Sequence, residues 1–190
     1  MAKKLESTFL NMVLVLTIIS VIAAAALGFT FTKTDSKIKE MQAQKKTSAI
    51  KKVVPHFDNN PDSEKYSVEG IEGLEFYPAK KGGTLVGTAV ETFSDNGYAG
   101  RIDVMIGFND KLDIIDYVIL NHNETPGLGA RLSDNKFKSQ FPGKNPKSFK
   151  LVVKKDGGEV DAITAATISS RAFLDAVNKA VEGLKKGGKQ

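Results

Sequence analysis

The chain has 190 residues, enough for one membrane segment and one small domain, because domains usually contain about 100–150 residues. It contains no cysteine and only two histidines. This composition excludes a disulfide framework, a thiolate nucleophile and a cysteine-ligated iron–sulfur cluster, and it disfavours a zinc or haem site built from histidine. The side chains alone are therefore poorly suited to redox or metal chemistry.

The net charge of +5 is concentrated in one short segment. Residues 33–52 contain seven lysines against two acidic residues, whereas residues 53–190 contain 18 basic and 19 acidic side chains. A nucleic-acid-binding protein would carry its positive charge on the folded domain, together with aromatic side chains. The nearly neutral domain excludes that class of function.

Residues 9–31 contain no charged side chain and span about 34 Å as a helix, enough to cross a hydrocarbon core of about 30 Å. They predict a transmembrane helix after a short tail at residues 1–8. The alternative is a signal peptide cleaved near Ala23, Ala24 and Ala25, but the apolar run continues beyond these alanines and favours a retained anchor. The count of flanking lysines favours a cytoplasmic position for the following segment, although long domains cross the membrane largely regardless of charge.

Residues 33–54 are rich in helix-forming residues and predict a helical stalk that ends before Pro55, because a residue before proline disfavours helical geometry. Residues 56–67 are rich in Asn, Asp, Pro and Ser and predict a linker. The expected organisation is a stalk and linker over residues 32–67 and a folded domain over residues 68–190.

The folded part has strand signals followed by one clear helix. Six short extended runs occur, at residues 73–78, 84–93, 100–108, 112–120, 149–154 and 160–163. Tight polar turns join neighbouring runs, which indicates antiparallel hairpins. Residues 169–186 place Phe173, Val177, Ala180, Val181 and Leu184 on one helical face. The fold class is therefore α+β: one N-terminal transmembrane helix, then a small domain with an antiparallel sheet and packed helices.

Residues 161–170 read DAITAATISS, where the last predicted strand ends and the helix begins. Hydroxyl groups, small alanines and free backbone amides meet there at the positive end of a helix, a combination that favours binding of a phosphate. Ordinary N-capping by Ser or Thr is the alternative explanation.

Residues 121–131 read NHNETPGLGAR. Pro126 stiffens this loop, and Gly127 and Gly129 allow the backbone to approach a flat ligand closely. His122, Glu124 and Thr125 add polar groups beside it. The alternative is a rigid surface loop without a function, since Pro-Gly pairs are common in turns.

The order of elements and these two motifs together resemble the FMN-binding domain shared by the G subunit of the Rnf complex and the C subunit of the sodium-translocating NADH:quinone reductase. The family motif D-x-x-[ST]-G-A-[ST] is matched by Asp161, Thr164, Ala166 and Thr167. Ala165 departs from it, because it stands where the family usually has glycine. In that family a flavin transferase joins the FMN phosphate to the last hydroxyl of the motif, so the resemblance implies a phosphoester bond at Thr167.

The resemblance also implies which residues contact FMN, with no catalytic residue and no metal. Near the phosphate it implies Asp161, Thr164, Ala165, Ala166, Ser169 and Ser170. Near the isoalloxazine ring it implies His122, Glu124, Thr125, Gly127, Leu128 and Gly129.

The function implied by the resemblance is that of an electron-transfer subunit in a membrane complex that couples ferredoxin:NAD electron transfer to movement of Na⁺ or H⁺. The implied partners are other membrane subunits, including one that carries flavin, and the flavin transferase. The implied location is the inner membrane, single-pass, with the domain on the extracytoplasmic side, against the lysine count. The chain length favours the Rnf complex over the quinone reductase.

Two other functions remain as alternatives. One is a membrane-anchored binding or assembly module without a redox role. The other is a serine hydrolase that uses Ser169 or Ser170 with His122 and an Asp, although the chain lacks the G-x-S-x-G motif of such enzymes.

Overall fold

The computed structural model describes residues 8–54 and 56–187 of the chain. The chain divides into two compact units, Met1–Gln44 and Lys45–Gln190. A single helix, α1 (Phe9–Val53), covers both the apolar stretch and the predicted stalk. The helix ends shortly before Pro55, as the sequence predicts.

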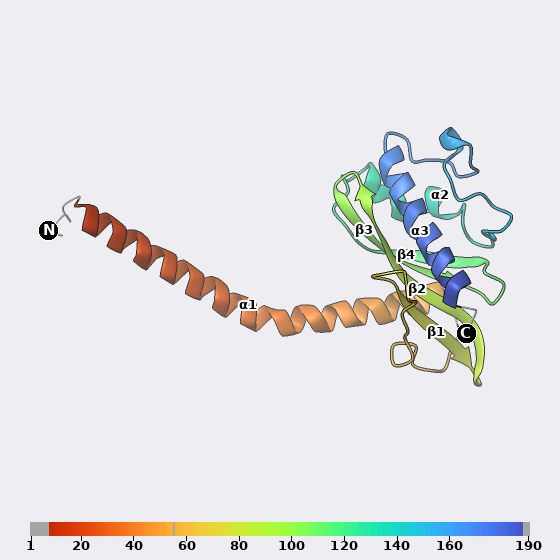
Figure 1. Cartoon of the computed structure of the whole chain (residues 1–190), viewed down its shortest axis with the longest axis horizontal. Coiled ribbons are helices and arrows are strands. Elements are labelled where there is room, and N and C mark those ends of the chain that lie inside the picture. Colours follow the sequence, from red (N-terminus) through yellow and green to blue (C-terminus); the bar gives the residue numbers. More distant parts are fainter. Residues whose placement is uncertain (1–7, 55, 188–190) are drawn as a thin grey trace. The chain divides into compact units, whose positions relative to one another are not determined.

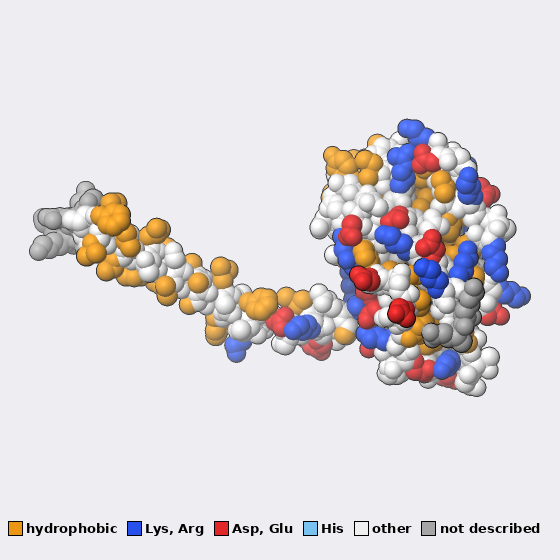
Figure 2. Space-filling view, viewed as in Figure 1, with side chains coloured by type: hydrophobic (Ala, Val, Ile, Leu, Met, Phe, Trp, Pro, Cys, Tyr) orange, Lys and Arg blue, Asp and Glu red, His pale blue; other side chains and the backbone are white. Residues whose placement is uncertain are grey.

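The first part of α1 is apolar and exposed. It is long and apolar enough to cross a membrane, and it is the one such helix among the described residues. Large side chains such as Phe9, Leu10 and Leu27 are more than 70% exposed. Figure 2 shows hydrophobic side chains along this part, whereas charged side chains of both signs cover the folded unit. Such a long apolar surface is typical of contact with lipid or another protein.

The folded unit contains one antiparallel sheet of four strands in the order β1-β2-β3-β4 (Figure 1). The strands are β1 (Glu75–Lys81), β2 (Thr84–Gly97), β3 (Gly100–Phe108) and β4 (Ile114–His122). They correspond to the first four runs predicted from the sequence. In the central register Val90 pairs with Ile106, and Ile106 pairs with Tyr117.

The last two predicted strands, residues 149–154 and 160–163, are wrong. These segments form only an isolated parallel bridge between Val153 and Val160, and a 3₁₀ turn, η2 (Lys154–Asp156), begins at the last residue of the first of them. Their apolar side chains are nonetheless buried in the core that α3 covers, and Asn178 of α3 donates to the Leu151 carbonyl at 3.0 Å. The apolar pattern therefore indicates buried side chains here, although the two segments do not pair as strands of a sheet.

Helix α3 (Thr167–Gly187) covers one face of the sheet (Figure 1). Its predicted apolar face is buried against β1, β2 and β3, with Phe173 and Ala180 fully enclosed. Thr92 of β2 donates from Oγ1 to the Ala176 carbonyl at 2.9 Å, which fixes the helix along the strand.

The other face of the sheet packs against the C-terminal end of α1. Ile50 and Val53 lie at 3% and 0% exposure beside Tyr77 and Met105. Gly107 permits this contact, because a Cβ atom there would lie 2.0 Å from the Val53 carbonyl oxygen. The end of the predicted stalk thus belongs to the core of the folded unit.

Three short elements between β4 and α3 are absent from the sequence prediction: η1 (Gly129–Ser133), α2 (Asn135–Lys138) and η2. An aromatic cluster holds the first two against α3. Phe141 packs edge-on against Phe173 with ring centroids 5.1 Å apart, and the Tyr117 hydroxyl donates to the Leu132 carbonyl. This packing fixes the position of the loop that precedes η1.

Candidate functional site

Helix α3 begins at Thr167, directly after a tight turn. The turn is closed by a hydrogen bond from the Ala166 amide to the Ile163 carbonyl at 2.9 Å. Its third residue, Ala165, has a φ of +60°, as the third residue of a type II turn requires. Thr167 is half-buried and is the first residue of α3, and the amides at the start of a helix have no partner within the helix itself.

The two serines that follow are buried and bonded inside the protein. Ser170 accepts from the Ile163 amide and donates to the Ala166 carbonyl, both at 3.0 Å. Ser169 donates from Oγ to Oε2 of Glu124 at 2.5 Å. Ser170 therefore stabilises the turn before α3, and Ser169 joins α3 to the loop after β4.

Glu124 is the buried centre of that loop, with 5% of its surface exposed. Besides the Ser169 hydroxyl, its carboxylate accepts the Ala99 amide at 3.1 Å, and its own amide donates to Nδ1 of His122 at 3.1 Å. Gly129 must be glycine for this arrangement, because a Cβ atom there would lie 2.2 Å from Oε2 of Glu124. The Glu124 side chain therefore bonds the loop after β4 to two other segments, the turn between β2 and β3 and the start of α3.

A cavity of about 520 Å³ lies between this loop and the N-terminus of α3. The residues that line it come from the β2–β3 turn, the loop and the start of α3: Tyr98, Glu124, Thr125, Leu128, Gly129, Ala165, Ala166, Thr167, Ile168 and Ser169. The structure thus brings together the two motifs that the sequence places about 40 residues apart.

Five residues of the sequence-predicted site do not line this cavity: His122, Gly127, Asp161, Thr164 and Ser170. Sequence reasoning missed two that do, Tyr98 and Ile168. These side chains are 70% and 47% exposed. The available signal for Tyr98 was its place directly after the pair Asn96-Gly97, which is a typical turn sequence.

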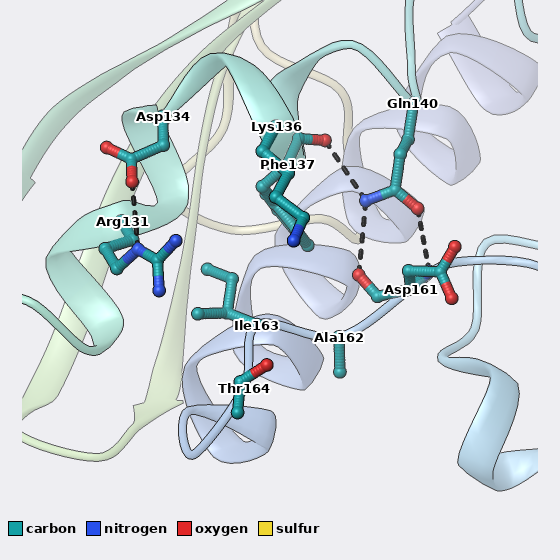
Figure 3. A pocket seen from close by; sticks show the side chains of 9 residues that line it. All are labelled: Arg131, Asp134, Lys136, Phe137, Gln140, Asp161, Ala162, Ile163 and Thr164. Atoms are coloured by element: carbon teal, nitrogen blue, oxygen red, sulfur yellow. Dashed lines mark hydrogen bonds and ion pairs between the residues drawn. The ribbon is translucent and has the colours of Figure 1, made fainter.

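Asp161 and Thr164 instead line a second cavity of about 340 Å³, together with Arg131, Lys136 and Gln140 (Figure 3). Gln140 accepts the Asp161 amide at 2.7 Å and donates to the Asp161 carbonyl at 3.1 Å. The Asp161 carboxylate pairs with Lys154 at 2.8 Å. Gln140 therefore anchors the backbone at Asp161, the first residue of the matched motif. The side chains of Asp161 and Thr164 lie outside the first cavity.

The electrostatics of the first cavity are unusual for an anion site. Among the described residues that line it, Glu124 is the only one with a charged side chain, and none is Lys, Arg or His. The available positive potential comes from the amides and dipole of α3. Among the described residues no cluster of His, Cys, Asp or Glu could hold a metal ion. Tyr98, Leu128 and Ile168 offer apolar surface, and the volume lies in the range of small-molecule sites, about 300–1,000 Å³.

Comparison with known proteins agrees with this geometry. Residues 97–182 match the FMN-binding domain family, whose matched region includes both motifs and the cavity between them. The chain therefore contains an FMN-binding domain.

Two relatives define the family more closely. The chain is 39% identical to the G subunit of the Na(+)-translocating ferredoxin:NAD(+) oxidoreductase complex of Acetobacterium woodii, over 89% of this chain and 88% of that protein. It is 34% identical to the G subunit of the ion-translocating oxidoreductase complex of Methanosarcina acetivorans, over 90% of this chain and 92% of that protein. The chain belongs to the family of G subunits of ion-translocating (Rnf) oxidoreductase complexes, and it is a membrane-anchored protein.

A solved structure is also similar. The crystal structure of Shewanella oneidensis NqrC aligns with 67% of this chain and 68% of that chain, with 21% sequence identity and a TM-score of 0.47.

Proposed function

We propose that this chain carries FMN in the cavity beside α3, joined through a phosphoester bond to Oγ1 of Thr167. It serves as the electron-transfer subunit of an ion-translocating oxidoreductase complex. The observation that carries the proposal is the position of Thr167, which is at once the first residue of α3 and part of the wall of the cavity that Glu124 also lines. When bound, FMN supplies the electron-transfer chemistry that a chain without cysteine does not provide itself.

The charge of the cavity favours a covalent tether. A free phosphate monoester carries up to two negative charges near neutral pH, and the lining offers it one carboxylate and no cationic side chain. Ester formation removes one ionisable oxygen, so the remaining anion is better matched to the partial positive charge of about half a unit at a helix N-terminus. The bond keeps FMN in a site whose electrostatics would hold it weakly.

The other lining residues have simpler roles in this proposal. Tyr98, Leu128 and Ile168 provide apolar walls for the flat ring system, and Thr125 adds a polar edge. The amides at the start of α3 face the phosphate. Ser169 and Ser170 act through their internal hydrogen bonds by holding this geometry.

The proposal places the folded unit on the extracytoplasmic side of the membrane. There it would exchange electrons with other membrane subunits, including one that carries flavin, after a flavin transferase has attached FMN.

Because the native chain has no cysteine, a single cysteine introduced in place of the exposed Lys81 reports directly on which side of the membrane the folded unit lies. Labelling of intact cells by a membrane-impermeant thiol reagent is expected, and labelling only after lysis would place the domain in the cytoplasm.

Intact mass spectrometry of the protein from its native host tests the tether. The expected mass is that of the chain plus FMN less one water, with flavin fluorescence that survives denaturation. Thr167→Ala should remove the added mass, whereas Thr167→Ser, which keeps a hydroxyl, and Thr164→Ala should retain it. Covalent flavin on Thr167→Ala would refute the assigned residue. A colourless wild-type protein of unmodified mass would instead support an assembly module without a redox role.

A further inference from the structure

The cavity wall contains one charged side chain, and its charge has no partner. Glu124 is 5% exposed and forms no ion pair with any residue that the structure describes. Its two oxygens accept one hydrogen bond each, Oε1 from the Ala99 amide and Oε2 from the Ser169 hydroxyl. A buried charge without a counter-charge costs stability, and hydrogen bonds compensate for only part of that cost.

The side chain is also fixed in place. A Cβ atom on Gly97 would lie 2.7 Å from Oε1, and one on Gly129 would lie 2.2 Å from Oε2. The carboxylate therefore fills a slot between the backbones of the β2–β3 turn and the loop. It cannot turn away from the cavity without breaking both hydrogen bonds.

The fold does not need the negative charge for these contacts. A glutamine at this position has the same shape, with an oxygen that accepts from Ala99 and a nitrogen that donates to the Ser169 oxygen. We propose that Glu124 sets the reduction potential of the bound flavin through its fixed negative charge. This inference rests on the proposed function, because it requires FMN in the same cavity.

The direction of the effect follows from electrostatics. Reduction adds electrons to the bound group, and a neighbouring negative charge that is itself buried opposes that addition. Glu124 therefore lowers the potential and makes the reduced site a stronger electron donor. Removal of the charge should shift the potential to more positive values.

Three variants separate the effect of charge from that of shape. Glu124→Gln removes the charge and keeps the shape, whereas Glu124→Asp keeps the charge. The control, Glu182→Gln, neutralises an exposed glutamate of α3 that does not line the cavity. The full chain carrying flavin is titrated in the presence of redox mediators. The midpoint potential should rise in Glu124→Gln, stay closer to the wild-type value in Glu124→Asp and remain unchanged in Glu182→Gln. Equal potentials in Glu124→Gln and the wild type, or equal shifts in Glu124→Gln and Glu124→Asp, would overturn the inference.

A second measurement does not depend on loading with flavin. The flavin-free full chain is unfolded by heat, and Glu124→Gln should unfold at the same or a higher temperature because it removes a buried unpaired charge. A clearly lower unfolding temperature would show that the carboxylate is needed to hold the fold and would overturn the inference. A wild-type chain that carries no flavin after coexpression with the transferase would refute the proposed function itself, which is a separate outcome.

Discussion

Ala165 has a backbone φ of +60° and stands two residues before Thr167, the first residue of α3. An L-residue with a side chain is disfavoured in this left-handed conformation by about 1–2 kcal/mol. The family motif usually has glycine at this position. The chain therefore carries strain in the turn that presents its proposed attachment residue.

Replacement of this alanine by glycine should stabilise the protein. Ala165→Gly relieves the strain, while the greater freedom of glycine in the unfolded chain opposes the gain by about 0.4–1 kcal/mol. The net increase in the free energy of unfolding should be up to about 1 kcal/mol, measured by denaturant titration. The matched control is Ala162→Gly, whose φ is not positive and which should destabilise. A loss of stability in both variants would contradict this account of the turn.

The folded unit should require the end of α1. Ile50 and Val53 are almost fully buried against the sheet, and burial of such side chains contributes about 1.5–3 kcal/mol each. A fragment of residues 45–190 should therefore unfold cooperatively, whereas a fragment of residues 56–190 should lose several kcal/mol or aggregate. Thermal unfolding compares the two, with residues 33–190 as the control of unchanged stability. Equal unfolding temperatures for all three fragments would show that the α1 contact adds little.

Acid should destabilise the folded unit partly through Glu75. The Tyr77 hydroxyl donates to this carboxylate at 2.5 Å and lowers its pKa below the usual value of about 4.5, with further help from Lys65 and Lys46 and against the effect of burial. A lowered pKa in the folded state gives stability that is present above pH 4.5 and is lost as the pH falls through the folded-state pKa.

The free energy of unfolding should consequently decline below about pH 4.5, and this decline should be shallower in Glu75→Gln. Chemical denaturation at a series of pH values measures both slopes. The exposed Glu72 provides the control, because Glu72→Gln should follow the wild type. Parallel curves for the wild type and Glu75→Gln would exclude this contribution.

The sequence predicted the elements whose apolar residues follow a clear strand or helix periodicity. The four strands and α3 fall in this class, since Ile102, Val104 and Ile106 alternate as β3 requires and face the α3 side of the sheet. The segments at residues 149–154 and 160–163 carry the same apolar signal. Their side chains are buried by packing against α3, although the segments do not pair as strands. The local sequence pattern therefore could not distinguish them from true strands.

The site was predictable as two motifs but not as one cavity. Residues 161–170 and 121–131 are recognisable by residue type, yet their contact depends on the hydrogen bond between Ser169 and Glu124, which spans 45 residues. Tyr98 and Ile168 carry no special chemistry in the sequence. They become part of the site only because the β2–β3 turn and the first turn of α3 meet there.

Two of the hydroxyls that the family resemblance implies near the phosphate, those of Ser170 and Thr164, should behave differently on removal. Ser170→Ala leaves the buried Ile163 amide without its acceptor, and an unsatisfied buried group costs about 1–3 kcal/mol. Thr164 is exposed, so Thr164→Ala should change stability by less than about 0.5 kcal/mol.

Urea titration measures the stability of both variants, and intact mass reports covalent flavin. Ser170→Ala should be less stable yet still carry flavin at Thr167, because its hydroxyl acts within the turn and outside the cavity. Loss of flavin from Ser170→Ala at unchanged stability would instead assign this hydroxyl to the phosphate. That outcome would require the turn before α3 to open when FMN is attached, since Ser170 is fully buried in the structure.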